Sequence, residues 1–379
     1  TIVAPTEILA QQHYNSFKSL LIKTNINCSL LTGSSTKKER SEIKTNLKNG
    51  SLNILIGTHA VLEGNVEFKN LGIAIIDEQH RFGVAQRSKL WLKNNLPPHI
   101  LVMTATPIPR TLAMTIYGDL DVSIINKLPP GRIPVKTYHR YENKRLQVFK
   151  FIKNQIDENK QVYIVYPLIE ESSKLDYKDL MDGYESISRY FSKPKYQISI
   201  VHGKMNAEEK KIEMDRFVKN KTQIMVATTV IEVGVDVPNA SLILIESAER
   251  FGLSQLHQLR GRVGRGKKQS YCILMSSNKL SENGKVRLKT MVDTNNGFNI
   301  AEVDLKLRGP GDLLGTQQSG IIKLKISDLV KDSELILLAR NEAIKILKND
   351  PSLSNKENLV LNRTISKLEL DKSFWNLVS

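Results

Sequence analysis

Ile73-Ala74-Ile75-Ile76-Asp77-Glu78-Gln79-His80 is the stretch that decides the fold class of this 379-residue chain. Four apolar residues followed by two carboxylates are typical of a buried strand that ends at a polar site. In parallel sheets, ligands bind at the carboxyl ends of strands, so a metal–phosphate site is expected there. Hydrolysis of a triphosphate needs an oxygen ligand for Mg²⁺ and a base that orients the attacking water. Asp77 suits the first role and Glu78 the second; the alternative is an acidic pair that only ends a strand.

Apolar runs and helical patterns alternate along the chain, which is typical of βαβ units around a parallel sheet. We predict a first series of strands at Thr1–Ala4, Ile26–Leu31, Leu52–Gly57, Leu71–Ile76 and Ile100–Thr104. A second series is predicted at Gln161–Tyr166, Gln197–His202, Gln223–Ala227, Leu242–Glu246 and Ser270–Leu274. Predicted helices include Glu7–Ile22, Lys37–Leu47 and one that runs from an Asn206/Glu209 capping pair to Val218. The fold class is therefore α/β, with two parallel-sheet domains.

A Pro/Gly cluster, Leu128-Pro129-Pro130-Gly131-Arg132-Ile133-Pro134, separates the two series and is typical of a linker. The predicted parts are a first domain over 1–128, a linker over 129–140, a second domain over 141–296 and a C-terminal segment over 297–379. We expect the last part to open with glycine-rich loops and to end in helices at Leu335–Leu347 and Leu359–Leu377.

The net charge of +16 and the pI near 9.6 favour a polyanionic partner. Residues 321–379 hold ten Lys/Arg against eight Asp/Glu, so the excess lies in the body of the protein. Because lysine outnumbers arginine and Asn and Ile are abundant, a compositional bias is the alternative explanation. Cys28 and Cys272 fit no metal or redox spacing, which suits a reducing cytosol. No apolar run reaches membrane-spanning length and no secretory signal is visible.

The run Gln258-Leu259-Arg260-Gly261-Arg262-Val263-Gly264-Arg265-Gly266 carries three arginines on a glycine-punctuated turn. Arginine presents a fork of donors that fits phosphate oxygens two at a time, and glycine lets the backbone approach a ligand. This pattern is suited to a side chain that reaches into a triphosphate site from outside. A solvated basic loop is the alternative.

Two further motifs follow predicted strands. Thr104-Ala105-Thr106 offers small hydroxylated residues that can hydrogen-bond a neighbouring carboxylate or a ligand. In the second series, the hydroxyl of Thr228 could contact nucleic-acid phosphate, while Gly234 and Asp236 could face a ribose. When each motif is taken alone, a plain turn is the alternative explanation. His59 and His202, near strand ends, are by themselves more typical of structural residues.

In this order, the motifs resemble those of the superfamily 2 helicases and translocases: Ala4-Pro5-Thr6-Glu7, then Asp77 to His80, Thr104 to Thr106, and Gln258 to Arg265. The resemblance implies two RecA-like domains, the first incomplete, that close around ATP and Mg²⁺. It also implies a nucleotide contact from Gln258 and arginine fingers at Arg262 and Arg265.

The same resemblance implies roles for other positions. Those that would bind ATP are His80, Gly234 and Asp236. Those that would contact DNA or couple it to the motor are Thr6, Gly33, Thr58, His59, Thr104, Thr106, His202, Thr228, Arg308, Gln317 and Gln318.

Longer runs resemble the RecG family of fork-remodelling translocases, notably Arg81 to Arg87, Tyr166 to Ser172 and the glycine-rich run from Leu307 to Gly320. This resemblance implies an ATP-dependent DNA helicase that regresses stalled forks and migrates Holliday junctions in recombination and repair. Double-stranded and branched DNA would be its partners, and it would act as a monomer in the bacterial cytoplasm at the nucleoid. The late run would be the translocation segment; a compact structural loop is the alternative.

No Gly-x-x-x-x-Gly-Lys-Ser/Thr phosphate loop occurs in the sequence. Because the chain opens inside an apolar strand pattern, we expect it to be an N-terminally truncated fragment without ATPase activity of its own. Two alternatives stay open. One is an Mfd-like transcription-repair translocase, although such proteins usually carry Glu where this chain has Gln79. The other is a non-enzymatic DNA-binding remnant.

Overall fold

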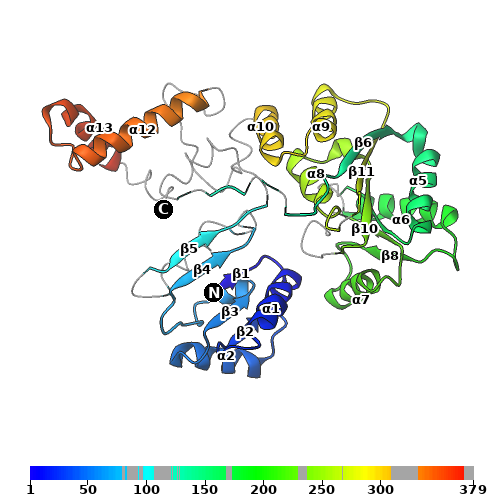
Figure 1. Ribbon diagram of the computed structural model, residues 1–379, viewed down its shortest axis with the longest axis horizontal. Coiled ribbons are helices and arrows are strands. Elements are labelled where there is room, and N and C mark those ends of the chain that lie inside the picture. The colour runs from blue at the N-terminus through cyan, green and yellow to red at the C-terminus, as the bar shows by residue number, and fades with distance from the viewer. Residues whose placement is uncertain are drawn as a thin grey trace.

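The chain folds into two parallel α/β sheets followed by a pair of helices (Figure 1). The computed structural model describes residues 1–78, 82, 93, 97–105, 121, 123–125, 127, 129–167, 173–228, 237–266, 268–308 and 332–370. The predicted fold class is confirmed. The limits of the domains remain predictions.

The first sheet has five strands in the order β2-β3-β1-β4-β5, and all of its pairings are parallel. Its strands are β1 (Ile2–Val3), β2 (Cys28–Leu31), β3 (Ile54–Gly57), β4 (Ile73–Ile76) and β5 (His99–Val102). Its helices are α1 (Glu7–Leu21), α2 (Lys37–Asn49) and the short η1 (His59–Leu62). Because all five strands run in the same direction, their carboxyl ends lie at one edge of the sheet.

Side-chain alternation gives this sheet two apolar faces. In β3, Leu55 packs into a cluster with Leu47 of α2, whereas its neighbour Ile56 packs into a second cluster with Ala10 of α1. A strand whose successive residues are both buried is what a sheet covered on both faces requires. The short strands are therefore held between helices, and the loops at their ends stay accessible for function.

The second sheet is also parallel, with the order β6-β11-β10-β7-β9-β8. Its strands are β6 (Lys136–Tyr141), β7 (Gln161–Val165), β8 (Ile198–Val201), β9 (Ile224–Ala227), β10 (Ala240–Ile245) and β11 (Tyr271–Ser276). Its helices are α5 (Arg145–Asp157), α6 (Ser173–Tyr190), α7 (Ala207–Val218), α8 (Leu253–Arg260), α9 (Glu282–Asp293) and α10 (Gly297–Arg308). Short 3₁₀ turns are η3 (Glu142–Lys144) and η5 (Ala248–Arg250). The second pair of clusters again alternates along the central strands: Tyr163 packs with Phe217 of α7, and Ile164 packs with the cluster that holds Phe149 of α5.

The C-terminal part of the described chain contains α12 (Ser333–Asn349), η6 (Lys356–Asn358) and α13 (Leu359–Leu370). Both predicted helices there are present over the described residues. In Figure 1 the α12–α13 pair stands apart from the second sheet. Among the described residues, the structure contains no helix with the length and apolar character needed to cross a membrane.

Each predicted strand overlaps an observed one, but the prediction missed β6, most of which fell in the expected linker. Its sequence, Lys-Thr-Tyr-His-Arg-Tyr, is polar because it forms an edge strand, and only Thr137 is buried. The expected glycine-rich loops at the start of the C-terminal segment were also wrong for residues 297–308, which form α10. Ile300, Ala301 and Leu305 bury one side of this helix, and α10 packs against α8 and α9.

Candidate functional site

The carboxyl edge of the first sheet gathers most of the predicted first-domain residues. The residues that follow its strands are Thr6 after β1, Gly33 after β2, Thr58 and His59 after β3, Asp77 and Glu78 after β4, and Thr104 after β5. In sequence these positions span about a hundred residues, and the parallel topology brings them to one edge. This is where open α/β sheets bind ligands.

Asp77 is held in place by two neighbours. Its backbone N–H donates to the Val3 carbonyl at 2.9 Å, which continues the sheet by one residue. Its side-chain Oδ2 lies 3.0 Å from Nε2 of His13, which comes from α1. Both side chains are partly exposed, at 29% for His13 and 19% for Asp77, so the carboxylate is oriented without being sealed from a ligand.

Glu78 has a backbone φ of 50°, a left-handed conformation that is uncommon for a residue with a side chain. Its Oε2 accepts a hydrogen bond of 3.2 Å from the backbone N–H of Ala105, in the motif after β5. Strain of this kind costs on the order of 1–3 kcal/mol and is concentrated at functional sites. The expected contact between the two motifs is therefore present, with a backbone N–H as the donor.

The donor set at this edge fits Mg²⁺ bound together with a nucleotide. Within the described part of the chain, His, Cys, Asp and Glu form no cluster of three or more that could hold a metal by themselves. Mg²⁺ in phosphate sites is usually held by one or two carboxylates together with the phosphates and water. Asp77 supplies such a carboxylate.

Three other predicted residues already have structural contacts. Thr6 caps α1, because its hydroxyl accepts from the Leu9 N–H at 3.3 Å. Thr58 is buried and its N–H donates to the Leu31 carbonyl at 3.1 Å. The His59 ring lies 4.8 Å from the buried Phe82 ring, centroid to centroid.

The arginine-rich turn contains two kinds of arginine: Arg260 is buried, whereas Arg262 and Arg265, the two predicted fingers, are half-buried. Arg260 is the last residue of α8 and is only 3% exposed. Its guanidinium donates to the Met291 and Thr294 carbonyls, both at 2.9 Å, and contacts Nδ1 of His257 at 3.1 Å. Arg260 is thus a core residue that joins α8 to the end of α9. It follows the buried Leu256 by four positions, so both side chains lie on the same face of α8.

Arg262 and Arg265 lie after the end of α8 and are half-buried. Their Nε atoms donate to the carbonyls of Gln258 and Gly261, each at 3.3 Å. Gly264 adopts a φ of 77°, which only glycine adopts readily, and its carbonyl accepts from Arg132 Nε at 3.0 Å. The turn is therefore shaped by its glycine and tied to residues before β6.

His202 and Thr228 follow β8 and β9, which are neighbours in the second sheet. Burial, followed by the charges of Lys210 and Lys204, lowers the pKa of His202. Thr228 is 2% exposed, and its Oγ1 has no hydrogen-bond partner among the described residues. Arg308 ends α10. The predicted residues outside the described ranges are His80, Thr106, Gly234, Asp236, Gln317 and Gln318.

Sequence reasoning missed an ion pair at the end of β10, in which the carboxylate is buried and the arginine is partly exposed. Arg145 donates from both terminal nitrogens to Glu246, at 2.6 and 2.9 Å, and Glu246 is 2% exposed. Burial raises the pKa of Glu246, and Arg145 opposes that shift. The available sequence signal was Glu246 directly after the apolar strand β10. Many strands end in an acidic residue, so this signal does not indicate an ion pair by itself. His13 was missed because it lies on α1, where a polar residue is ordinary.

Comparison with known proteins extends the similarity over nearly the whole chain. Residues 1–115 match the DEAD/DEAH box helicase family, residues 143–267 the helicase conserved C-terminal domain, and residues 294–379 the C-terminal part of domain 3 of ATP-dependent DNA helicase RecG. The RecG helicase of Synechocystis is 49% identical over 352 residues, or 93% of this chain and 42% of that protein. The RecG helicase of Bacillus subtilis is 47% identical over 366 residues, or 97% of this chain and 53% of that protein.

The chain belongs to the RecG family. It spans about half the length of the RecG proteins that it matches. A solved RecG bound to a three-way DNA junction superposes with a TM-score of 0.69 at 42% identity, over 88% of this chain and 43% of that one. The yeast Dbp5 helicase bound to RNA and ADP BeF3 shares the fold at 16% identity, with a TM-score of 0.53 over 81% of this chain and 74% of that one.

Proposed function

We propose that the protein is the motor part of an ATP-dependent DNA helicase that remodels branched DNA, regressing stalled forks and migrating Holliday junctions in recombination and repair. The observation that carries this proposal is the close relationship to RecG along nearly the whole chain, in which Asp77 and Glu78 stand together at the ligand-binding edge of the first sheet. A related RecG has been solved on a three-way DNA junction, which makes branched DNA the substrate to test first.

On the nucleotide side, Asp77 would hold Mg²⁺ and Glu78 would orient the attacking water. Mg²⁺, when bound with ATP, neutralises charge on the phosphates. The Ala105 N–H restrains the Glu78 carboxylate, and the His13 imidazole restrains Asp77. Two carboxylates on adjacent residues are thereby restrained by different partners, one on α1 and one after β5, which is consistent with two different tasks.

In the second domain, Gln258 would contact the nucleotide, and Arg262 and Arg265 would serve as arginine fingers. Half-buried arginines held by backbone carbonyls lose less conformational freedom on meeting a phosphate. His80, Gly234 and Asp236 would complete the nucleotide site.

On the DNA side, the positive net charge supplies sequence-independent attraction to phosphates. The residues proposed to contact DNA or couple it to the motor are Thr6, Gly33, Thr58, His59, Thr104, Thr106, His202, Thr228, Arg308, Gln317 and Gln318. His202 and Thr228 lie at the ends of adjacent strands, which supports treating them as one contact region. We expect a monomer that works at the nucleoid in the bacterial cytoplasm.

The test is ATP hydrolysis by the complete gene product with three-way-junction DNA, linear duplex DNA and no DNA. The proposal expects the junction to stimulate hydrolysis most and fork regression to accompany it. Glu78→Gln should keep nucleotide binding and reduce hydrolysis by about 10³-fold or more, since general-base or water-orienting groups act only on the chemical step. Stimulation by linear duplex alone, without junction preference, would favour an Mfd-like translocase. DNA binding without hydrolysis would favour a non-enzymatic protein.

A further inference from the structure

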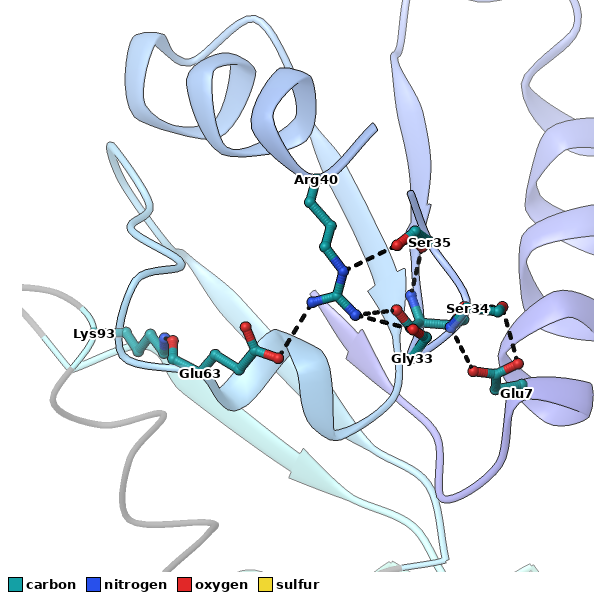
Figure 2. A network of polar contacts seen from close by, with 8 residues as sticks. Glu7, Gly33, Ser34, Ser35, Arg40, Glu63 and Lys93 are labelled. Atoms are coloured by element: carbon teal, nitrogen blue, oxygen red, sulfur yellow. Dashed lines mark hydrogen bonds and ion pairs between the residues drawn. The ribbon is translucent and has the colours of Figure 1, made fainter. Parts of the chain in front are cut away.

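A network of polar contacts joins the loops that follow β1, β2 and β3 (Figure 2). These strands are neighbours in the sheet, in the order β2-β3-β1. Their loops carry Thr6, Gly33 and Thr58, which are three of the residues proposed to contact DNA or couple it to the motor. Three side chains outside that set tie the loops together: Glu7, Arg40 and Glu63.

Arg40 reaches the β2 loop because of how α2 begins. Thr36 and Glu39 form a reciprocal capping box, with contacts of 2.8 and 3.3 Å, that fixes the first turn. Helical side chains tilt towards the N-terminus, so the residue after Glu39 points back over the loop that precedes the helix. Arg40 there donates to the carbonyls of Thr32, Gly33 and Ser35, at 2.7, 3.3 and 3.1 Å.

The opposite side of the same loop is held by Glu7, from the first turn of α1. Its two carboxylate oxygens accept from the N–H and the hydroxyl of Ser34, both at 3.0 Å. A Cβ built on Gly33 would lie 3.0 Å from Glu7 Oε1, so the approach leaves little room for a side chain there. The β2 loop is therefore held by two charged side chains: Arg40 donates to its carbonyls, and Glu7 accepts from Ser34.

The loop after β3 joins the network through the second terminal nitrogen of Arg40. Arg40 Nη1 donates to Glu63 Oε1 at 3.3 Å, and Glu63 directly follows η1, which begins at His59. The Glu63 carbonyl in turn accepts from Lys93 Nζ, which also donates to the Val66 carbonyl at 2.8 Å. Only Arg40 touches both the β2 loop and Glu63 among these contacts, and its side chain is 23% exposed.

We propose that Glu7, Arg40 and Glu63 form a brace that sets the spacing of the three loops as one rigid surface for the DNA backbone. Neighbouring strands lie about 4.8 Å apart, so the β2 and β1 loops are separated by about 10 Å. That distance is close to the axial rise of three base pairs of duplex DNA, at about 3.4 Å each. The brace rests on the proposed function, and its members act through the loops: they are positioning residues.

The experiment measures ATP hydrolysis by the complete gene product against the concentration of three-way-junction DNA. Arg40→Ala should raise the DNA concentration for half-maximal stimulation by about tenfold, in the range typical of coupled contacts, and leave DNA-independent hydrolysis unchanged. Arg40→Lys should resemble Arg40→Ala, because a single ammonium cannot reproduce a fork that reaches three carbonyls and a carboxylate. Lys48→Ala, at the far end of α2, removes the same charge as a control and should leave the DNA dependence unchanged.

An unchanged DNA dependence in Arg40→Ala overturns the brace, and so does full function in Arg40→Lys, since that result assigns the effect to charge alone. If Arg40→Ala fails to fold, Ser34→Ala decides instead: it removes one contact to Glu7 and should raise the half-maximal DNA concentration by about two- to threefold, and no rise overturns the brace. Failure of the proposed function itself is distinguishable, because the unmodified protein would then show no DNA stimulation at all.

Discussion

His13 Nε2 lies 3.0 Å from Asp77 Oδ2, so a helix that follows the first strand restrains the carboxylate that ends the fourth. The two residues are 64 positions apart. A carboxylate can only accept, so the imidazole donates. Groups that hydrogen-bond a metal-binding carboxylate from behind keep it aimed at the metal, and their loss typically costs 10–100-fold in metal affinity or activity.

We therefore expect His13→Ala to raise the Mg²⁺ concentration needed for half-maximal ATP hydrolysis by about tenfold. His13→Gln retains an N–H donor at similar reach and should recover part of the loss. Binding of a fluorescent ATP analogue, titrated with Mg²⁺ and without turnover, gives a readout independent of catalysis. Equal Mg²⁺ dependence in His13→Ala and the unmodified protein would show that His13 does not position Asp77 for the metal.

The three arginines of the α8 turn should respond in two different ways. Arg262→Ala and Arg265→Ala are expected to reduce DNA-stimulated hydrolysis by about 10³–10⁵-fold, as loss of an arginine finger does. Arg260→Ala instead removes the donor for one buried and one partly buried carbonyl and should lower the free energy of unfolding by about 3 kcal/mol. Urea denaturation and ATPase assays of all three variants separate the roles.

Lys268→Ala is the matched control for that set, because it removes one exposed positive charge close to the same turn. It should change neither stability nor turnover appreciably. Near-normal hydrolysis in both Arg262→Ala and Arg265→Ala would contradict the assignment of fingers to this turn.

His257 makes stability depend on pH. Burial, reinforced by Arg260, lowers its pKa to about 4 from an ordinary value of 6.5. Between pH 6.5 and 4, His257 is protonated in the unfolded chain but neutral in the folded protein. The free energy of unfolding therefore decreases as pH falls through this range. The difference corresponds to about 3 kcal/mol. His257→Gln should remove this part of the acid sensitivity, measured by urea denaturation at pH 7, 6, 5 and 4.5. Parallel stability–pH curves for the two proteins would contradict the assignment.

The strands were predictable because burial on both faces makes parallel strands continuous apolar runs, as in β4, β7 and β10. β6 was not predicted because this edge strand buries one of its six residues, so its sequence pattern resembles that of a polar loop. The helices α5, α6, α8 and α9 were not predicted either, although α5 carries an apolar stripe of Val148, Phe149, Ile152 and Ile156. Secondary structure at a sheet edge is decided by its neighbours, which local pattern does not reveal.

The site divides in a similar way. The gathering of Asp77, Glu78 and the other strand-end residues at one edge could be predicted, because a parallel sheet sends every strand end to the same edge. The partners of these residues could not: His13, Glu7 and Arg40 sit on helices, where charged and polar residues are ordinary. The family resemblance singled out Arg262 and Arg265, but only the packing of α8 against α9 shows that Arg260 faces the core.

The Arg145–Glu246 pair offers a test of how the end of β10 is built. Glu246 precedes Ser247, whose φ of 46° turns the chain towards α8. Removing Arg145 leaves the buried Glu246 carboxylate without its counter-charge. Because the Arg145 side chain is 32% exposed, we expect Arg145→Ala to destabilise the fold by about 3 kcal/mol at neutral pH, the low end of the range for buried pairs. Replacing both residues with leucine should cost less than that single change, because no buried charge then remains.

The sign of the pH effect follows from the pKa of Glu246, which burial raises in the folded protein. A raised carboxyl pKa contributes stability that is fully present below the unfolded pKa, near 4.5, and is lost as pH rises through the folded pKa. Loss of Arg145 raises the folded pKa further, so the deficit of Arg145→Ala should be small near pH 4.5 and widen towards pH 8. Urea denaturation of both proteins across that range measures it. A deficit that stays constant with pH would mean that Arg145 stabilises the fold through packing and not through the charge of Glu246.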